Sequence, residues 1–219
     1  MTTIIKKNEV FLKVEAEPHL HKELSEHFQF EVPGAKFMPA VKRRYWDGKI
    51  RLYSPGTGEI YVGLYDYLTD YLEQKGYDYE VLEDKYFGRP TDIEEYVTPE
   101  GTAAFIRSLR LPYKVRDYQL RGIYTAIKFR RKLLLSPTGS GKSLIIYALV
   151  RWHLLKKREI LIIVPTVSLV EQLYKDFIEY GWNVRDVHKI MGGVEKYTDQ
   201  PVVISTWQSI YKEPKKFFE

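Results

Sequence analysis

Two observations predict an α/β protein in which a small α+β domain precedes a parallel sheet. Residues 1–84 mix strand-like alternation with helical periodicity, which is typical of an α+β domain. Beyond residue 112, apolar strand segments alternate with helical segments, and this order favours a parallel sheet covered by helices. The 219 residues suffice for two cores, because domains usually span about 100 to 200 residues.

Residues 1–84 predict the element order β-α-β-β-α-β. A periodicity of two indicates a strand and a periodicity of 3.6 indicates a helix, while glycine and proline mark the turns. The expected elements are strand 9–16, a helix that opens at Pro18, strands 49–53 and 59–62 around the turn 54–58, a helix from 64 to 75 closed by Gly76, and strand 77–82.

Residues 85–111 are predicted to connect the two domains. The periodicity fades there, and glycine and proline interrupt regular structure, apart from one short helix expected at 102–109. The second domain then takes residues 112–219. Its expected elements are strand 132–135, helix 143–155, strand 160–164, helix 168–180 and strand 202–205.

Charge is spread unevenly along the chain. Residues 1–90 carry 13 Lys and Arg against 15 Asp and Glu, a net of −2, whereas residues 91–219 carry 21 against 14, a net of +7. The basic excess therefore belongs to the second half. Such an excess favours binding to polyanions through phosphate contacts, although many basic proteins bind no nucleic acid.

Composition excludes several classes of protein. The chain has no cysteine, which excludes disulfides and thiolate zinc sites, and its five histidines are scattered. No apolar run approaches the roughly 18 residues of a membrane span, and the N-terminus lacks the features of a secretory signal. We therefore expect a cytoplasmic protein in which any metal ion is bound together with a ligand.

A glycine-rich loop is the strongest chemical signal. The apolar segment 132–135 leads into it, and an apolar helix follows, so the order is strand, loop and helix. Glycines there can turn successive N–H groups toward a phosphate, and the helix N-terminus adds its positive end. Lys142 would contact the β- and γ-phosphates of ATP, and the Ser143 hydroxyl would ligate Mg²⁺. The expected phosphate-binding residues are Pro137, Thr138, Gly139, Ser140, Gly141, Lys142 and Ser143.

The strict form of this motif has glycine where Ser136 stands, so the match is imperfect. The alternative is a glycine-rich turn before an ordinary helix. The strand and helix on either side favour the phosphate loop.

A candidate adenine site lies 23 residues before Lys142. Gln119 opens a predicted helix, and its amide both donates and accepts, so it can pair with adenine N6 and N7 together. Arg116 or Tyr118 could cover the face of the ring. By itself this pattern is more typical of a solvated helix face, but its spacing from the phosphate loop favours the adenine site.

Two later strands deliver small hydroxyl residues at their carboxyl ends. Pro165 and Thr166 follow strand 160–164, and Ser205 and Thr206 end strand 202–205. Ligands bind at the carboxyl ends of parallel strands, and hydroxyls there suit contacts to a sugar-phosphate backbone. The alternative for each is an ordinary strand followed by a capped helix.

Residues 112–219 resemble the first half of the first RecA-like motor domain of a superfamily 2 helicase. Arg116 and Gln119 match the family's Q motif, and 136–143 match its motif I. Several ordered matches are more specific than any one. The further matches are Pro165, Thr166 and Gln172 for motif Ia, Gly192 and Gly193 for motif Ib, and Ser205, Thr206, Trp207 and Gln208 for motif Ic.

Residues 37–52, with Tyr-Trp-Asp-Gly-Lys-Ile-Arg-Leu at 45–52, resemble the N-terminal domain of UvsW-type phage helicases, and 165–207 also resemble that family. The resemblance implies use of ATP and Mg²⁺ to unwind or remodel branched DNA, such as forks and Holliday junctions, in recombination, repair and replication restart. The family's DExH motif is absent here, so we expect an N-terminal portion of a longer motor that hydrolyses ATP poorly by itself.

A basic and aromatic cluster in the first domain is a second candidate for DNA binding. Arg43, Arg44 and Trp46 lie in a stretch of ten residues with five cations and two aromatics. Cations can bind phosphates while an aromatic ring stacks on an unpaired base. The alternative is that the aromatics fill a small core and the cations form a solvated face.

Three functions remain open from the residues. The first is an ATP-dependent DNA helicase on branched DNA. The second is an ATP-driven motor that acts on RNA or that serves as a restriction-type translocase. These motifs contact the nucleic-acid backbone and therefore separate such classes poorly. The third is a non-catalytic, nucleotide-gated DNA-binding module.

Overall fold

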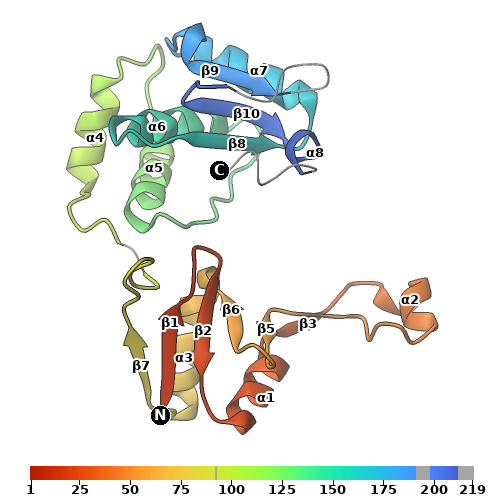
Figure 1. The fold of residues 1–219 in the computed structure, drawn as a ribbon. Helices are drawn as coiled ribbons and strands as arrows, with labels where there is room; N and C mark the ends of the chain where they lie inside the picture. Colours follow the sequence, from red (N-terminus) through yellow and green to blue (C-terminus); the bar gives the residue numbers. More distant parts are fainter. Residues whose placement is uncertain (92, 191–197, 212–219) are drawn as a thin grey trace. The chain divides into compact units, whose positions relative to one another are not determined.

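The computed structural model describes residues 1–91, 93–190 and 198–211. The chain forms two compact units, Met1–Asp92 and Ile93–Glu219, each with its own elements and core (Figure 1). The division falls inside the segment 85–111 that the sequence predicts as a connector. None of the helices in the described ranges has the length and apolarity that a membrane crossing requires.

The first unit is built on a five-stranded sheet of order β5-β6-β2-β1-β7, in which only β1 and β7 are parallel. Helices α1 and α3 pack on it, and α3 ends at Gly76, whose φ of 71° is the left-handed cap that the sequence predicts. The elements are β1 (Thr2–Lys6), β2 (Phe11–Glu15), α1 (Pro18–His27), β5 (Tyr53–Ser54), β6 (Glu59–Tyr61), η2 (Val62–Leu64), α3 (Tyr65–Lys75) and β7 (Tyr79–Leu82).

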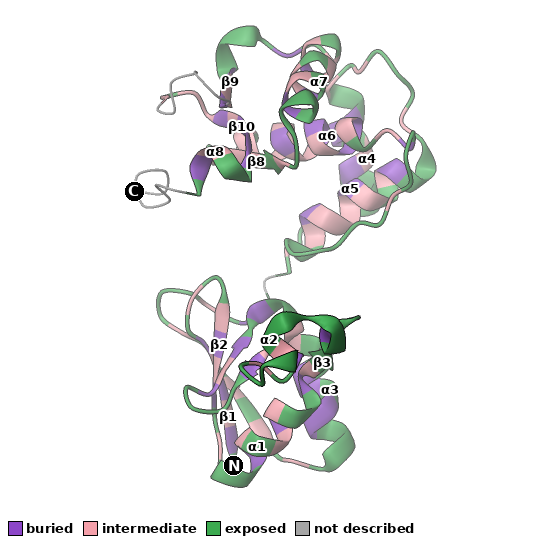
Figure 2. Ribbon diagram, turned by 90° about the vertical axis from the view of Figure 1, so that its right-hand side faces the viewer, coloured by how far each residue is buried: buried purple, intermediate pink, exposed green. Residues whose placement is uncertain are grey.

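An arm interrupts this unit between residues 29 and 51. It consists of the two-stranded ribbon of β3 (Gln29–Glu31) and β4 (Lys49–Arg51), with η1 (Ala35–Phe37) and α2 (Pro39–Lys42) between them. The arm projects from the rest of the unit (Figure 1), and most of α2 is exposed (Figure 2). We define residues 29–51 as the arm.

The predicted strand 49–53 is wrong as a single element. Its first residues form β4 of the arm, whereas Tyr53 begins β5 in the main sheet and is 1% exposed. Periodicity did not separate the two, because both halves alternate. The sequence also missed β1, β3 and α2.

Within its described residues, the second unit has a three-stranded, all-parallel sheet of order β8-β10-β9, which confirms the α/β prediction. Strand β10 lies in the middle, with Val202 opposite both Ile160 and Val187. The elements are α4 (Pro99–Ser108), α5 (Asp117–Phe129), α6 (Lys142–Leu155), β8 (Ile160–Val164), α7 (Val167–Glu179), η3 (Val184–Asp186), β9 (Val187–Ile190), β10 (Val202–Thr206) and α8 (Trp207–Ile210).

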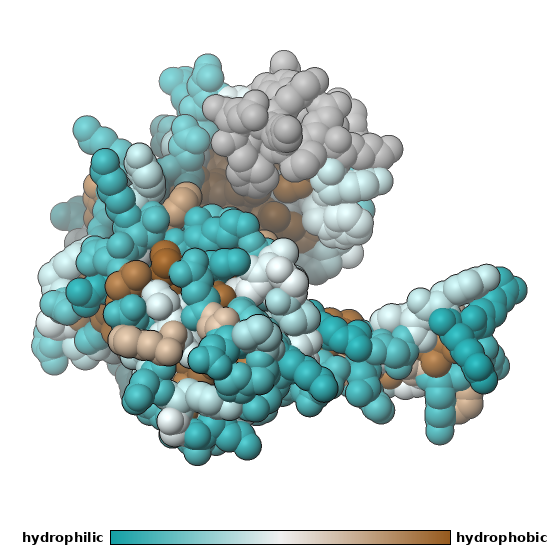
Figure 3. All heavy atoms as spheres, turned by 60° about the horizontal axis from the view of Figure 1, so that its bottom comes forward, coloured by the Kyte–Doolittle hydropathy of each residue, from teal (hydrophilic) through white to brown (hydrophobic). Residues whose placement is uncertain are grey.

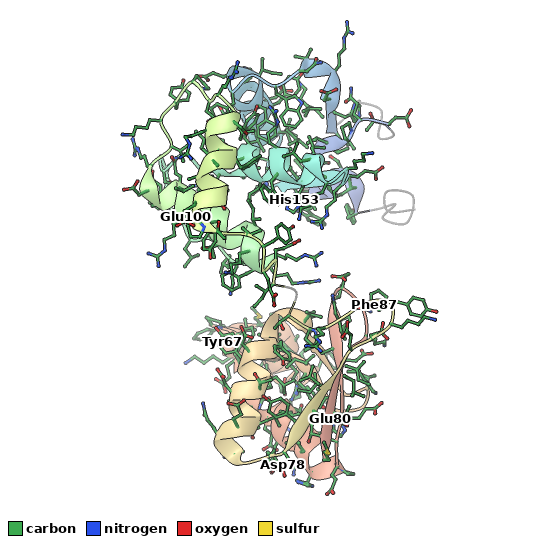
Figure 4. All side chains as sticks on the ribbon, turned by 90° about the vertical axis from the view of Figure 1, so that its left-hand side faces the viewer. Tyr67, Asp78, Glu80, Phe87, Glu100 and His153 are labelled. Carbon is green, nitrogen blue, oxygen red and sulfur yellow. The ribbon has the colours of Figure 1, made fainter. Side chains whose placement is uncertain are left out.

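Helix α6 is the central element of this unit, because it contributes to two cores. Tyr147 and Val150 pack with α7, β9 and β10, while Ile145 and Ala148 pack with α4 and α5. This explains why the helix is apolar on all sides. Figure 4 labels His153 on this helix and Glu100 in the first turn of α4.

The predicted strand 132–135 is wrong. These residues form no strand, and Leu133 and Leu135 are 84% and 87% exposed. A strand needs a neighbour to pair with its backbone groups, and within the described ranges no strand pairs with this segment. The sequence also missed β9.

Candidate nucleotide and nucleic-acid sites

The phosphate loop has the backbone shape that its glycines were expected to allow. Gly139 and Gly141 both have φ of 76°, in the left-handed region, and Gly141 caps the N-terminus of α6. The Lys142 ammonium folds back and donates to the carbonyls of Ser136 and Pro137 at 3.2 and 2.8 Å. A phosphate that binds the loop would offer this ammonium stronger, charged acceptors than those carbonyls.

Gln119 links α5 directly to this loop. Its side-chain nitrogen donates to the Ser140 carbonyl at 3.0 Å, and its side-chain oxygen accepts from the Arg116 backbone N–H at 2.9 Å. The residue is 5% exposed. A Cβ added at Gly141 would lie 2.4 Å from the Gln119 nitrogen, so a larger residue would displace this amide, and the φ of 76° also favours glycine.

Both ends of the Gln119 amide therefore have partners within the protein. Pairing with adenine would require it to exchange those bonds. The assignment of Gln119 to adenine stays a prediction, and its contact with the loop is a function that the sequence did not reveal.

A pocket of about 650 Å³ lies beside the loop, within the size range of small-molecule sites. Tyr118 is 46% exposed at its edge, and its hydroxyl donates to the Ser140 carbonyl at 2.8 Å. Arg116 donates to that hydroxyl at 3.3 Å. The lining residues are Arg116, Tyr118, Arg121, Gly122, Thr125, Leu133, Leu134, Leu135, Ser136, Pro137, Thr138, Gly139, Ser140 and Ile145.

Ser143 stands at the start of α6, where its hydroxyl lies 3.1 Å from that of Tyr180. Burial raises the pKa of Tyr180 above its usual value, which keeps this phenol protonated. The buried Tyr147 also donates to the Tyr180 carbonyl at 3.1 Å. If Ser143 coordinated Mg²⁺, its hydroxyl would replace the hydrogen bond to Tyr180 with a bond to the metal. The sequence spacing did not indicate Tyr180 as a partner of Ser143.

The residues expected at the carboxyl ends of the strands differ in exposure. Pro165 and Thr166 are exposed between β8 and α7, and the Thr166 hydroxyl accepts from the Leu169 N–H at 3.3 Å as the cap of α7. Ser205 is fully buried and Thr206 is 4% exposed.

The hydroxyls of the buried Ser205 and Thr206 form hydrogen bonds within the protein. The Ser205 hydroxyl donates to the Thr206 carbonyl at 3.0 Å, and the Thr206 hydroxyl lies 2.9 Å from that of Ser209. These side chains do not present their hydroxyls to a backbone outside. Gly192 and Gly193 lie outside the described residues.

The arm separates its predicted DNA-binding residues. Arg43 and Arg44 are exposed, whereas Trp46 is half-buried and its indole N–H donates to the Lys49 carbonyl at 2.9 Å. Tyr45, beside it, is 83% exposed. The indole helps to hold the arm's own turn, whereas the tyrosine ring beside it is exposed.

The parallel sheet, the phosphate loop at the start of α6 and the adjoining pocket define a P-loop protein with part of a RecA-like domain. Residues 5–83 match the family described as DNA helicase UvsW, N-terminal, and residues 112–218 match the family described as Type III restriction enzyme, res subunit. The chain is 32% identical over 217 residues to the ATP-dependent DNA helicase uvsW of Enterobacteria phage T4. It is therefore a homologue of the phage UvsW-type helicases.

Solved structures agree with this relationship. A crystal structure of the UvsW helicase from bacteriophage T4 matches 99% of this chain and 78% of its own, with a TM-score of 0.85 and 28% identity. A second structure of T4 UvsW has the same TM-score and identity, and 45% of that chain is covered. The curated relative is matched over 94% of this chain but only 42% of its own length.

Proposed function

We propose that the protein binds ATP and acts on branched DNA as the N-terminal part of an ATP-dependent helicase. The observation that carries this is the phosphate loop, with Gly139 and Gly141 in left-handed conformations at the start of α6, beside a pocket of suitable size. Homology to UvsW-type helicases supports DNA as the substrate.

The loop residues from Pro137 to Gly141 would bind phosphates through their N–H groups, and Lys142 would neutralise the β- and γ-phosphates. Arg116 and Tyr118 line the pocket where the adenine ring would lie. Ser143 offers a hydroxyl oxygen, the type of ligand that Mg²⁺ takes together with phosphate oxygens. Within the described residues no His, Asp and Glu cluster could hold a metal alone.

Hydrolysis needs more than this loop. Phosphoryl transfer depends on positioning the attacking water and stabilising charge, and these 219 residues contain no DExH sequence. We therefore expect this chain to bind ATP and to hydrolyse it slowly. The place of action that fits this function is the cytoplasm of the host cell.

The DNA contacts that we propose lie on both units. Exposed Pro165 and Thr166 suit backbone phosphates, and the basic arm with Arg43 and Arg44 suits a branch point. The buried Ser205 and Thr206 would support the nearby backbone rather than touch DNA.

Lys142→Ala tests the nucleotide site. We expect it to weaken the binding of a fluorescent ATP analogue by at least about tenfold, because it removes a charge-assisted contact to phosphate. Lys175→Ala, which removes an exposed cation on α7, is the matched control and should bind normally. Equal affinity in the two variants would contradict the assignment of the loop.

Restriction-type translocation is a second candidate, because residues 112–218 match a restriction-subunit family. Competition between fork DNA, linear duplex and duplex RNA of equal length distinguishes the classes. A preference for forks supports the UvsW-type function, and equal binding of linear duplex supports translocation. A nucleotide-dependent change in fork affinity without any hydrolysis would support the gated binding module.

A further inference from the structure

The arm concentrates positive charge on a segment that a two-stranded ribbon joins to the rest of the unit. Residues 29–51 contain six Lys and Arg against two Asp and Glu, although residues 1–90 as a whole are net acidic. Figure 3 shows the arm reaching out from the unit with a largely hydrophilic surface. Its base is a two-stranded ribbon, and such ribbons are marginally stable alone. The arm is therefore built to present residues rather than to bury them.

The tip of the arm ends α2 in an unusual way. The Arg44 N–H bonds to the Val41 carbonyl at 3.0 Å and the Tyr45 N–H bonds to the Ala40 carbonyl at 2.9 Å, which is the Schellman pattern of a helix end. The pattern requires a left-handed residue, usually glycine, and here Arg44 has φ of 59°. The chain thus keeps a guanidinium where a glycine would relax the backbone.

The residue that follows is exposed where such helix ends normally pack an apolar side chain. Tyr45 is 83% exposed, and its neighbour Trp46 already holds the turn through its bond to the Lys49 carbonyl. The tyrosine ring has no structural task that the described contacts reveal. It directly follows Arg43 and Arg44 in the chain, and two exposed cations beside an exposed aromatic ring favour a polyanion with aromatic faces as the partner.

We propose that Tyr45 stacks on an unpaired base at a DNA branch, while Arg43 and Arg44 bind the phosphates on either side. Aromatic rings stack on any base through its π-face, and guanidinium groups bind phosphates in a fork geometry. An unpaired base occurs at a junction and not within a duplex. Tyr45 therefore determines the preference for branches, and this inference rests on the proposed DNA-binding function.

The left-handed arginine by itself does not distinguish the arm from other helix ends of the chain. The other described non-glycine residues with positive φ are also basic and also follow helices: Arg110, Arg130 and Lys157. Lys157 ends α6 with the same pattern, since its N–H bonds to the Leu154 carbonyl and that of Arg158 to the His153 carbonyl. What distinguishes the arm is the exposed tyrosine next in the chain, and Lys157 supplies a matched control.

The test compares affinities for a fork with an unpaired base at its junction and for a linear duplex. Tyr45→Ala in the 219-residue chain should weaken fork binding about 5- to 100-fold and leave duplex binding unchanged, whereas Tyr45→Phe should retain the preference. A fluorescent base analogue at the junction should report stacking with the native chain and lose that signal in Tyr45→Ala.

Arg44→Gly distinguishes the role of the guanidinium in DNA binding from any role of this residue in stability. It should leave the thermal midpoint equal or higher, because glycine suits the backbone, yet weaken fork binding and reduce its salt dependence by about one phosphate contact. Lys157→Gly relaxes the equivalent helix end in the other unit and should leave fork binding unchanged.

Unaltered fork preference in Tyr45→Ala would overturn this inference and leave the proposed function standing. Equal loss for fork and duplex would also overturn it, since stacking at a branch would not be involved. A native chain that binds the ATP analogue but shows no preference for forks would contradict the proposed branched-DNA function itself.

Discussion

At the scale of single residues, the Gln119 side chain connects helix α5 to the phosphate loop, next to Gly141. This side chain lies 21 positions before Ser140, and its amide donates to the Ser140 carbonyl and accepts from the Arg116 N–H. A residue expected to read adenine thus also holds the surface that would bind phosphates. Movement of Gln119 toward a bound base would break its bond to the Ser140 carbonyl and leave that carbonyl with the Tyr118 hydroxyl as donor, so the two tasks are coupled.

Gly141→Ala should therefore weaken nucleotide binding and stability more than Gly139→Ala. Both glycines have φ of 76°, so both variants are strained, but only at Gly141 would the new Cβ collide with Gln119. We expect Gly139→Ala to cost about 1 kcal/mol and Gly141→Ala about 1–3 kcal/mol more, because buried hydrogen bonds are lost. Denaturant unfolding and titration with the ATP analogue measure both effects.

A double variant with Gln119→Ala checks the cause. If the collision explains the cost, the two substitutions are non-additive, since the alanine at 119 makes room for the new Cβ. Equal costs at positions 139 and 141 would show that the contact with Gln119 is unimportant.

At the scale of elements, α7 shows that a predicted nucleic-acid residue also has a structural task. Thr166 caps this helix through its hydroxyl, and the helix packs Val170, Leu173 and Phe177 into the core beside the sheet. Loss of DNA binding in a Thr166 variant would therefore have two explanations. A substitution that keeps the cap and changes the charge separates them.

Thr166→Asp should retain stability while weakening DNA binding. Aspartate is a good N-cap and its charge suits the helix N-terminus, but it repels a phosphate. Thr166→Ala should instead cost about 1 kcal/mol of unfolding free energy, because the cap is lost. Thermal unfolding and fork-binding titrations distinguish the two. Thr98→Asp at the equivalent cap of α4 is the control, and unchanged DNA affinity in Thr166→Asp would exclude a phosphate there.

At the scale of the whole molecule, the two units have separate cores. The first packs α1 and α3 on its sheet, and the second has two clusters that share α6. Each unit can therefore lose stability through its own core residues. Figure 2 shows buried residues within each unit.

Leu72→Ala should destabilise the first unit and leave the nucleotide site intact. Leu72 is fully buried on α3, and such truncations cost about 2–5 kcal/mol through lost burial and a cavity. Hydrogen exchange should accelerate in β1, β2 and α3, with normal affinity for the ATP analogue. Phe177→Ala is the reciprocal variant, and accelerated exchange in both units from either change would contradict separate cores.

The sequence predicted several elements closely because their signals are local. Strand 160–164 agrees with β8, and helices 143–155 and 168–180 agree with α6 and α7 within one residue at each end. The strand predicted at 132–135 was wrong because its formation does not depend on local signals alone. Its apolar run indicates a strand, but strand formation depends on a neighbour that is not encoded in the run itself.

By itself, the sequence determined the phosphate loop, the alternation that produces a parallel sheet and the basic segment of the first unit. These depend on backbone preferences and periodicity within a few consecutive residues. The tertiary structure decided that Ser205 and Thr206 are buried, that Gln119 holds the loop, and that Tyr45 rather than Trp46 is exposed. Exposure and hydrogen-bond partners are set by how separate segments fold against one another, and local patterns do not contain that information.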